Sequence, residues 1–290
     1  MTQSIGKRID RLYTWNHLVT MFFLIIIVLV GGLTRLTDSG LSITRWEIVS
    51  GILPPFTQNQ WNAAFELYKQ IPQYNLINKN ISLEEFKIIY YWEYYHRILG
   101  RIFGIIFLIP FIYLVTKKVL SRSYNIKFFI LFLLILLQGF VGWYMVKSGL
   151  VELTSVSHYR LAMHLNLALI LFTSIFWYLL NIKELKNKKF FKSYKKNNFI
   201  KWFIFLIFLQ ITLGAFVSGL DAGKIYQTWP LMNNNYFPDD LNFNQTNISN
   251  IFSNHSLVQF LHRNMAYVIF IYTGLIIFYI FYKKNIHLYT

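Results

Sequence analysis

The sequence contains no cysteine and few charged residues. Only 14% of its 290 residues are Asp, Glu, Lys or Arg, whereas soluble domains carry roughly 25%. Without cysteine there can be no disulfide scaffold, zinc–thiolate site, iron–sulfur cluster or c-type haem attachment. The hydrophobic content of 55% excludes a disordered chain. These absences point to a protein that lies in a membrane.

Long apolar runs replace the missing charge. A helix needs about 20 mostly apolar residues to cross the hydrocarbon core of a bilayer. Six runs satisfy this length, at residues 17–33, 98–116, 127–146, 161–182, 199–219 and 257–282. The sequence therefore predicts an all-α integral membrane protein with six transmembrane helices.

The net charge of +16 is distributed unevenly between alternate connections. Residues 1–15, 117–127, 183–201 and the tail after 282 together carry +15, and the three other connections together carry −1. Lys and Arg accumulate on the cytoplasmic side of membrane proteins. We therefore expect both termini in the cytoplasm and the protein in the inner membrane of a cell. The excess charge is explained by topology, so we expect no nucleic acid as a partner.

Two long loops, residues 34–97 and 219–257, are expected on the outer side of the membrane. The ends of the spans before them and the first parts of the loops are similar in sequence. At a fixed offset of 183 residues, five residues of the first stretch have identical counterparts in the second. They are Gly31, Asp38, Gly40, Trp46 and Pro55, which match Gly214, Asp221, Gly223, Trp229 and Pro238. After each loop the next span opens with His-Arg, at His96 and His262. This repeat predicts an N-terminal four-helix half (1–182), a Lys-rich cytoplasmic linker (183–198) and an incomplete C-terminal half of two helices (199–290).

Three histidines are expected at one depth, near the outer ends of even-numbered spans. They are His96, His164 and His262, and each has a small residue four positions later and an arginine nearby. Residues four apart share a helix face, so a flat ligand could lie there. Imidazole ligates haem iron, and arginine pairs with carboxylates such as propionates. The alternatives are a hydrogen-bonded packing histidine or a proton relay. Zinc is disfavoured, since only Glu93-x-x-His96 has ligand spacing.

Glu93 is a candidate catalytic residue. It precedes His96 by three positions, and Gln259 stands at the matching place before His262. A carboxylate at the membrane edge is costly unless it is paired or functional. A surface ion pair with Arg97 would contribute little, so we expect Glu93 to face the ligand of His96. The Glu/Gln difference suggests one reactive site and one electron-transfer or structural site.

Several motifs together resemble haem A synthase, the enzyme family that completes the haem of cytochrome oxidase. They lie at residues 31–46, 51–55, 85–101, 142–150, 159–165, 219–223 and 259–263. The lack of cysteine resembles the mitochondrial and proteobacterial branch of the family. The resemblance implies an oxidoreductase that converts the C8 methyl group of haem O to a formyl group. It also implies eight helices in two four-helix halves, with haem O bound in the first half and haem b in the second.

Site residues and partners follow from the same resemblance. His96 and His164 would ligate the substrate haem, Glu93 would be the catalytic carboxylate, and His262 would ligate haem b. Candidate partners of the haem propionates are Arg97, Arg101, Arg160 and Arg263. Haem O synthase, cytochrome-oxidase assembly factors and an electron donor are implied as partners. The lipid bilayer surrounds the protein, and a homo-oligomer is compatible with the sequence.

The sequence departs from this family at its C-terminus. Because His96 and His164 are 68 residues apart, the partner of His262 would fall near position 330. The chain is therefore expected to lack the last two helices, as a truncated product, a fragment or a protein completed by another subunit. Two other classes remain as alternatives: a b-type electron-transfer cytochrome, which has no use for Glu93, and a transporter, which would bind no haem.

Overall fold

The computed structural model describes residues 2–45, 52–118, 122–150, 154–184, 198–241 and 248–283. The chain divides into two compact units, and each is described by itself. The first comprises Met1–Arg160 with Leu167–Phe190, and the second comprises Leu161–Asn166 with Phe191–Thr290. The predicted linker at 183–198 lies for the most part outside the described residues, so the predicted domain boundaries stay a prediction.

The prediction of an all-helical membrane protein is confirmed. Six helices are long and apolar enough to cross a membrane. They are α1 (Thr2–Leu36), α4 (Leu83–Thr116), α5 (Arg122–Gly149), α6 (His158–Glu184), α7 (Asn198–Gly219) and α8 (His255–Lys283). No β-strand occurs in the described ranges, apart from an isolated bridge between Met232 and Asn235.

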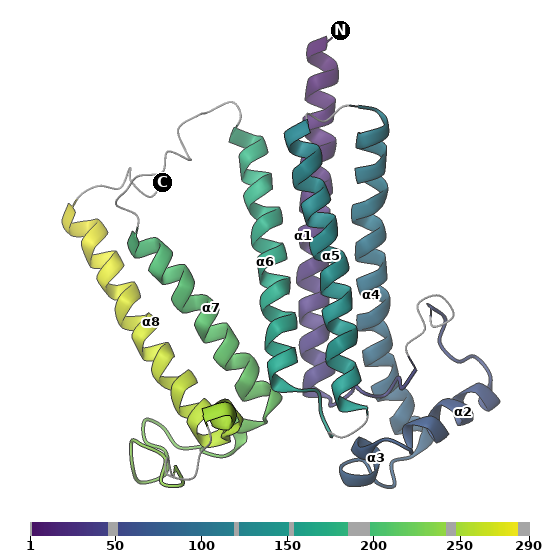
Figure 1. The fold of residues 1–290 in the computed structure, drawn as a ribbon, viewed down its shortest axis with the longest axis vertical. Helices are drawn as coiled ribbons and strands as arrows, with labels where there is room; N and C mark the ends of the chain where they lie inside the picture. Colours follow the sequence, from purple (N-terminus) through teal and green to yellow (C-terminus); the bar gives the residue numbers. More distant parts are fainter. Residues whose placement is uncertain are drawn as a thin grey trace. The chain divides into compact units, whose positions relative to one another are not determined.

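Four helices pack together in the first unit. Figure 1 shows α1, α4, α5 and α6 running alongside one another. One buried cluster joins them, with Leu24 from α1, Phe107 from α4, Phe128 from α5 and Leu171 from α6. Contact between helices in a bilayer depends on close packing of this kind. This shared core holds the four helices of the first unit together.

Helix α4 begins much earlier than the predicted span, at Leu83 rather than at residue 98. A capping box starts it, because the Ser82 side chain accepts from the Glu85 backbone and the Glu85 side chain accepts from the Ser82 backbone. Its 34 residues measure about 51 Å, well beyond the roughly 30 Å of the hydrocarbon core. His96 therefore lies more than three turns inside the helix, rather than near its outer end as the predicted span suggested.

The extension of α4 serves as a platform for the first outer loop. Helices α2 (Gln58–Tyr68) and α3 (Pro72–Leu76) lie beside it. An aromatic cluster fills the contact, with Trp61, Phe65 and Tyr68 against Phe86 and Tyr90. The pattern of aromatic residues four apart in α4 explains why this segment is helical before the predicted span begins at residue 98. What the sequence suggested as a continuous loop up to residue 97 is thus a small helical layer.

A buried tyrosine connects this layer to the exit of α1. The Tyr68 hydroxyl donates to Gln73 Oε1 at 3.0 Å and accepts from Asn78 Nδ2 at 2.7 Å. Burial raises the pKa of Tyr68 above its ordinary value, so it stays protonated. Gln73 Nε2 in turn donates to the Asp38 carbonyl at 2.9 Å. The outer layer is therefore tied to the loop that leaves α1.

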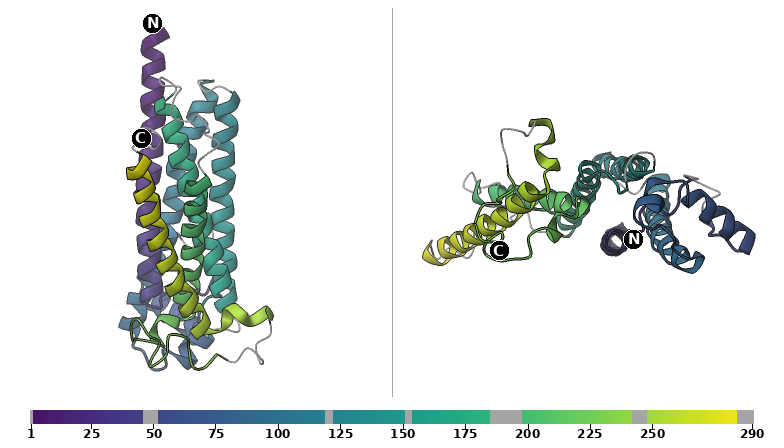
Figure 2. Two further views of the ribbon diagram at one scale, coloured as in Figure 1. Left: turned by 90° about the vertical axis from the view of Figure 1, so that its left-hand side faces the viewer. Right: turned by 90° about the horizontal axis from the view of Figure 1, so that it is seen from below.

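The second unit contains α7 and α8, which lie side by side in both views of Figure 2. The short 3-10 helices η2 (Ala222–Lys224) and η3 (Ile248–Ser253) lie in the loop between them. Their core includes Leu213, Ala215 and Phe216 of α7 and Val258 of α8. This pair corresponds to α1 and α4 in the predicted repeat.

The exits of α1 and α7 have matching backbone geometry. Helix α1 ends at Leu36 and α7 at Gly219, which is the same position at the offset of 183. Two residues later, Asp38 and Asp221 both adopt left-handed φ values, of 50° and 53°. Aspartate tolerates this conformation better than most residues with a side chain. Both loops therefore leave their helices through the same turn.

Candidate functional site

The ring of His96 packs directly against Gly31 of α1. A Cβ atom added at Gly31 would lie 2.9 Å from His96 Cε1. The ring makes a backbone hydrogen bond with Ile27, and its buried Nδ1 atom has no hydrogen-bond partner among the described residues. An imidazole that ligates a metal commonly donates from one nitrogen to a carbonyl and keeps the lone pair of the other free. The surroundings of His96 fit an axial haem ligand.

His262 has the same surroundings in α7 and α8. A Cβ atom at Gly214 would lie 3.0 Å from His262 Cε1. The ring makes a backbone hydrogen bond with Gln210, and its buried Nδ1 is without a partner in the described part of the chain. Gln210 and Gly214 occupy the repeat positions of Ile27 and Gly31. The fold thus builds one kind of histidine site twice.

The residue four positions after each histidine has different surroundings in the three sites. A Cβ atom added at Gly100, four residues after His96, would meet nothing within 4 Å, and Ala266, four residues after His262, is exposed. Ala168 below His164 is buried, with 6% of its surface exposed. The surface is therefore open at Gly100 and Ala266, and binding of a flat ligand there stays a prediction. His164 lies half-buried in the second turn of α6, and its pairing with His96 stays a prediction.

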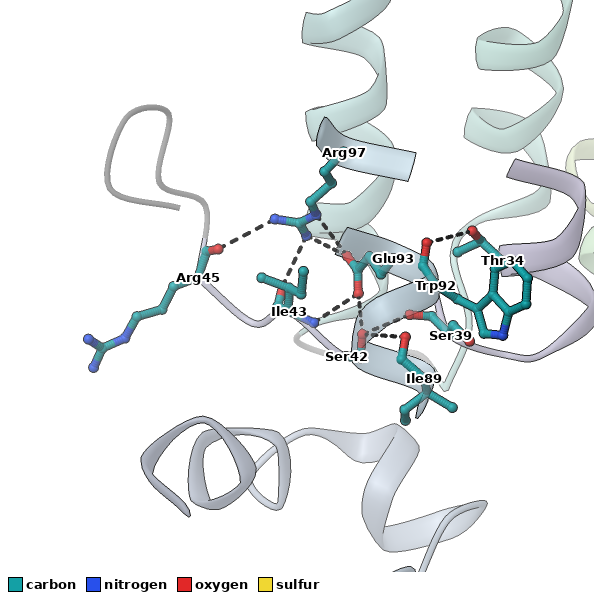
Figure 3. A network of polar contacts seen from close by, with 9 residues as sticks. All are labelled: Thr34, Ser39, Ser42, Ile43, Arg45, Ile89, Trp92, Glu93 and Arg97. Carbon is teal, nitrogen blue, oxygen red and sulfur yellow. Dashed lines mark hydrogen bonds and ion pairs between the residues drawn. The ribbon is translucent and has the colours of Figure 1, made fainter. Parts of the chain in front are cut away.

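Glu93 lies at the centre of a buried polar network, drawn in Figure 3. Its Oε1 pairs with Arg97 Nη2 at 2.5 Å, and the two side chains are 4% and 10% exposed. Its Oε2 accepts from Ser42 Oγ at 2.7 Å and from the Ile43 backbone N–H at 2.8 Å. The pair with Arg97 is therefore buried and is not a weak surface contact. Removing one partner of a buried ion pair is strongly destabilising.

The arginines predicted to bind propionates contact the outer loops. Arg97 donates to the Ile43 carbonyl at 3.0 Å, and Arg263 donates to the carbonyls of Thr228 and Leu231 at 3.0 and 3.1 Å. Arg101 lies half-buried one turn after Arg97. Binding of propionates by these side chains stays a prediction.

Arg160 has a different environment. Its Nη1 donates to the Tyr144 carbonyl at 2.8 Å, and its guanidinium lies 3.8 Å from the centre of the Tyr144 ring. Stacking on an aromatic face holds the planar group in place. The propionate role of Arg160 stays a prediction as well.

A second polar anchor holds the loop between α7 and α8. Asp240 accepts from the Tyr226 hydroxyl at 2.7 Å and from Ser256 Oγ at 2.6 Å. Burial raises the pKa of the Asp240 carboxyl, but the two hydrogen bonds outweigh it and hold this pKa below its ordinary value. Burial also raises the pKa of Tyr226. Asp240 is thus ionised and accepts both bonds at neutral pH.

Sequence reasoning missed four residues of the site. Gly31 and Gly214 lie against the imidazole rings of His96 and His262. The only indication of this in the sequence is that the two glycines match in the repeat. Ser42 and Ile43 carried no signal, since their role depends on the path of the loop over α4.

Comparisons with known proteins identify the family. The family model described as cytochrome oxidase assembly protein matches residues 14–290. A haem A synthase from Pelagibacter ubique is 50% identical over 269 residues, which cover 92% of this chain and 79% of the relative. One from Parvibaculum lavamentivorans is 48% identical over 245 residues, covering 84% and 70% of the two chains. The chain belongs to the haem A synthase family.

Membership of this family confirms the resemblance carried by the motifs. A further relative, the haem A synthase of Nitrosospira multiformis, is 45% identical over 244 residues, covering 83% of this chain and 68% of its own length. No solved structure matches this chain. The two histidine sites thus belong to a member of the haem A synthase family.

Proposed function

We propose that this chain makes haem A by oxidising the C8 methyl group of haem O to a formyl group. The observation that carries the proposal is the imidazole of His96, which lies against Gly31 one helical turn from Glu93 and whose buried Nδ1 has no hydrogen-bond partner among the described residues. The curated relatives are named haem A synthase, which supports the same reaction. The chain is accordingly an oxidoreductase.

The reaction is two hydroxylations followed by loss of water. Each hydroxylation replaces a C–H bond of the methyl carbon with a C–O bond and releases two electrons and two protons when water supplies the oxygen. The resulting geminal diol loses water to give the formyl group. The four electrons pass to an external oxidant such as dioxygen. Protons leave through a group that can accept them beside the methyl carbon.

Four residues have proposed roles. His96 and His164 ligate the iron of the substrate haem, and Glu93 is the catalytic carboxylate that accepts a proton from the carbon being oxidised. Arg97 pairs with the Glu93 carboxylate at 2.5 Å and fixes its orientation. His262 would hold haem b, which supplies electron transfer when bound. The arginines near these histidines would pair with haem propionates.

The proposed location is the inner membrane of a cell with both termini in the cytoplasm. The distribution of Lys and Arg between alternate connections supports this orientation. The haem sites then lie toward the outer face. Haem O synthase, cytochrome-oxidase assembly factors and an electron donor are the proposed partners, and a homo-oligomer is compatible with the sequence.

The purified full chain, incubated with haem O and dioxygen as the oxidant, is expected to form a hydroxylated or formyl haem. Extraction of the pigments and chromatography with visible spectra measure the product. A b-type cytochrome would bind haem and return haem O unchanged, so unchanged substrate in the presence of a haem spectrum would contradict the proposal.

Replacing Glu93 with glutamine is expected to reduce turnover by a factor of about 100 or more, the usual contribution of a positioned acid–base group. The substitution keeps the size of the side chain and removes its charge. The same pigment assay measures it. As a control, Glu84→Gln removes an exposed carboxylate that pairs with Lys87 in the same helix and should leave turnover unchanged. Full turnover by Glu93→Gln would rule out a catalytic carboxylate.

A further inference from the structure

One backbone segment is held in the same way in both repeats. Ile43 and Tyr226 occupy matching positions at the offset of 183. The Ile43 N–H donates to Glu93 Oε2 at 2.8 Å, and the Tyr226 N–H donates to Gln259 Oε1 at 3.2 Å. Glu93 and Gln259 each precede their histidine by three positions. Two chemically different side chains therefore accept the same backbone donor.

The backbone carbonyls of Ile43 and Tyr226 each accept a hydrogen bond as well, but the donor differs between the two repeats. Arg97 Nη2 donates to the Ile43 carbonyl at 3.0 Å, whereas Gln259 Nε2 donates to the Tyr226 carbonyl at 2.8 Å. A carboxylate has no donor. In the first repeat Arg97 therefore supplies the donor that the amide of Gln259 supplies in the second.

The arginines make a further matching contact two residues along the loop. Arg97 Nη1 lies 3.5 Å from the Arg45 carbonyl, and Arg263 Nη1 lies 3.0 Å from the Thr228 carbonyl. Arg45 and Thr228 are equivalent in the repeat. Figure 3 shows that the side chain of Arg45 points away from this contact, so only its backbone takes part.

Burial makes these bonds costly to lose. Glu93 and Gln259 are 3% and 7% exposed, and a buried polar group without a partner pays its full desolvation penalty. Both loops lie in the same relation to their histidine-bearing helix, although their sequences differ. The contacts therefore belong to the repeated unit rather than to one loop.

We propose that the residue three before and the residue one after each of these histidines form a loop latch. The latch comprises Glu93 and Arg97 in the first repeat and Gln259 and Arg263 in the second. It positions the backbone of the loop against the outer end of the histidine-bearing helix. For this task, Glu93 with its arginine and Gln259 are interchangeable, so docking of the loop does not require the charge of Glu93.

The latch is a positioning device, distinct from the proton transfer proposed for Glu93. Because hydrogen exchange measures loop docking without turnover, its result does not depend on the proposed reaction. A variant that keeps the loop docked and loses turnover separates the two roles of Glu93. The glutamine of the second repeat identifies that variant as Glu93→Gln.

The test is amide hydrogen exchange of the purified full chain, followed by mass spectrometry of the segments at 38–45 and 222–231. Glu93→Ala is expected to speed exchange of the first segment about tenfold or more, the effect of losing a charge-assisted hydrogen bond. Glu93→Gln is expected to stay within about twofold of the wild type, because Arg97 keeps the carbonyls of Ile43 and Arg45 as acceptors, as Arg263 keeps that of Thr228 beside the neutral Gln259. Glu84→Ala, which removes the exposed carboxylate, is the matched control and should change nothing.

The second repeat supplies an independent pair of variants in the other compact unit. Gln259→Leu is expected to speed exchange at 222–231, and Gln259→Glu to keep it slow, because Arg263 stands four residues later as Arg97 does after Glu93. Unchanged exchange in both Glu93→Ala and Gln259→Leu would overturn the latch. Exchange in Glu93→Gln as fast as in Glu93→Ala would overturn the interchangeability. If Glu93→Ala does not fold, the Gln259 pair decides both points.

Discussion

Replacing His96 with alanine is expected to abolish formation of hydroxylated or formyl haem by the purified chain. The substitution removes the nitrogen proposed to ligate the substrate iron and leaves a space beside Gly31. Altering even the partners of a metal ligand typically costs 10- to 100-fold in affinity, so loss of the ligand should cost more than about 100-fold. Pigment analysis after incubation with haem O measures the product, and the visible spectrum measures haem retained by the protein.

Two matched substitutions show whether the effect belongs to this site. His255→Ala makes the same change at an exposed position at the start of α8 and should leave turnover and haem content unchanged. His262→Ala should reduce haem bound in the second repeat while substrate binding at His96 persists. Product formation by His96→Ala at the wild-type rate would show that His96 is not the substrate ligand.

Replacing Gly31 with alanine is expected to have the second-largest effect. The added Cβ atom would lie 2.9 Å from His96 Cε1, closer than side chains normally approach. The ring must shift, since the backbone of α1 is held in the four-helix core. Overpacking of this kind typically costs 1–3 kcal/mol, and we expect turnover to fall about tenfold to 100-fold with a displaced Soret band.

Helix stability cannot explain such a loss, because alanine is the better helix former by about 1 kcal/mol. Gly32→Ala is the matched control, since a Cβ atom there would meet nothing within 4 Å. In the second repeat, Gly214→Ala should perturb His262 and Gly274→Ala should not, on the same criterion. An unchanged spectrum and rate in Gly31→Ala would mean that the ring of His96 does not rest on this glycine in the working protein.

Much of the fold follows from local sequence. The six spans are predictable because each must bury about 20 apolar residues in hydrocarbon, and their positions agree with α1 and α4–α8 to within a few residues at most ends. The start of α4 is the exception. Hydropathy marks only the part in the bilayer, whereas Leu83 begins the helix through its capping box and the packing of Phe86 and Tyr90 against α2.

The candidate residues could also be found from sequence, but their environments could not. Spacing identified Glu93, His96 and His262 because helical positions and repeats are written in the order of residues. Spacing also allows a Glu93–Arg97 pair, since residues four apart meet on any helix surface, but it does not show that this pair is buried. The loop that covers this pair comes from about 50 residues earlier in the chain, and local patterns contain no information about such contacts.

The sequence by itself determined the membrane class, the six helices, the repeat and the histidines, because each depends on composition or on regular spacing. Only the tertiary structure decided that Gly31 and Gly214 support the two imidazole rings and that Glu93 and Gln259 hold equivalent loop backbones. The physical reason is that a buried polar or close-packed atom is satisfied by whatever the folded chain brings beside it. That neighbour is set by the path of the whole chain.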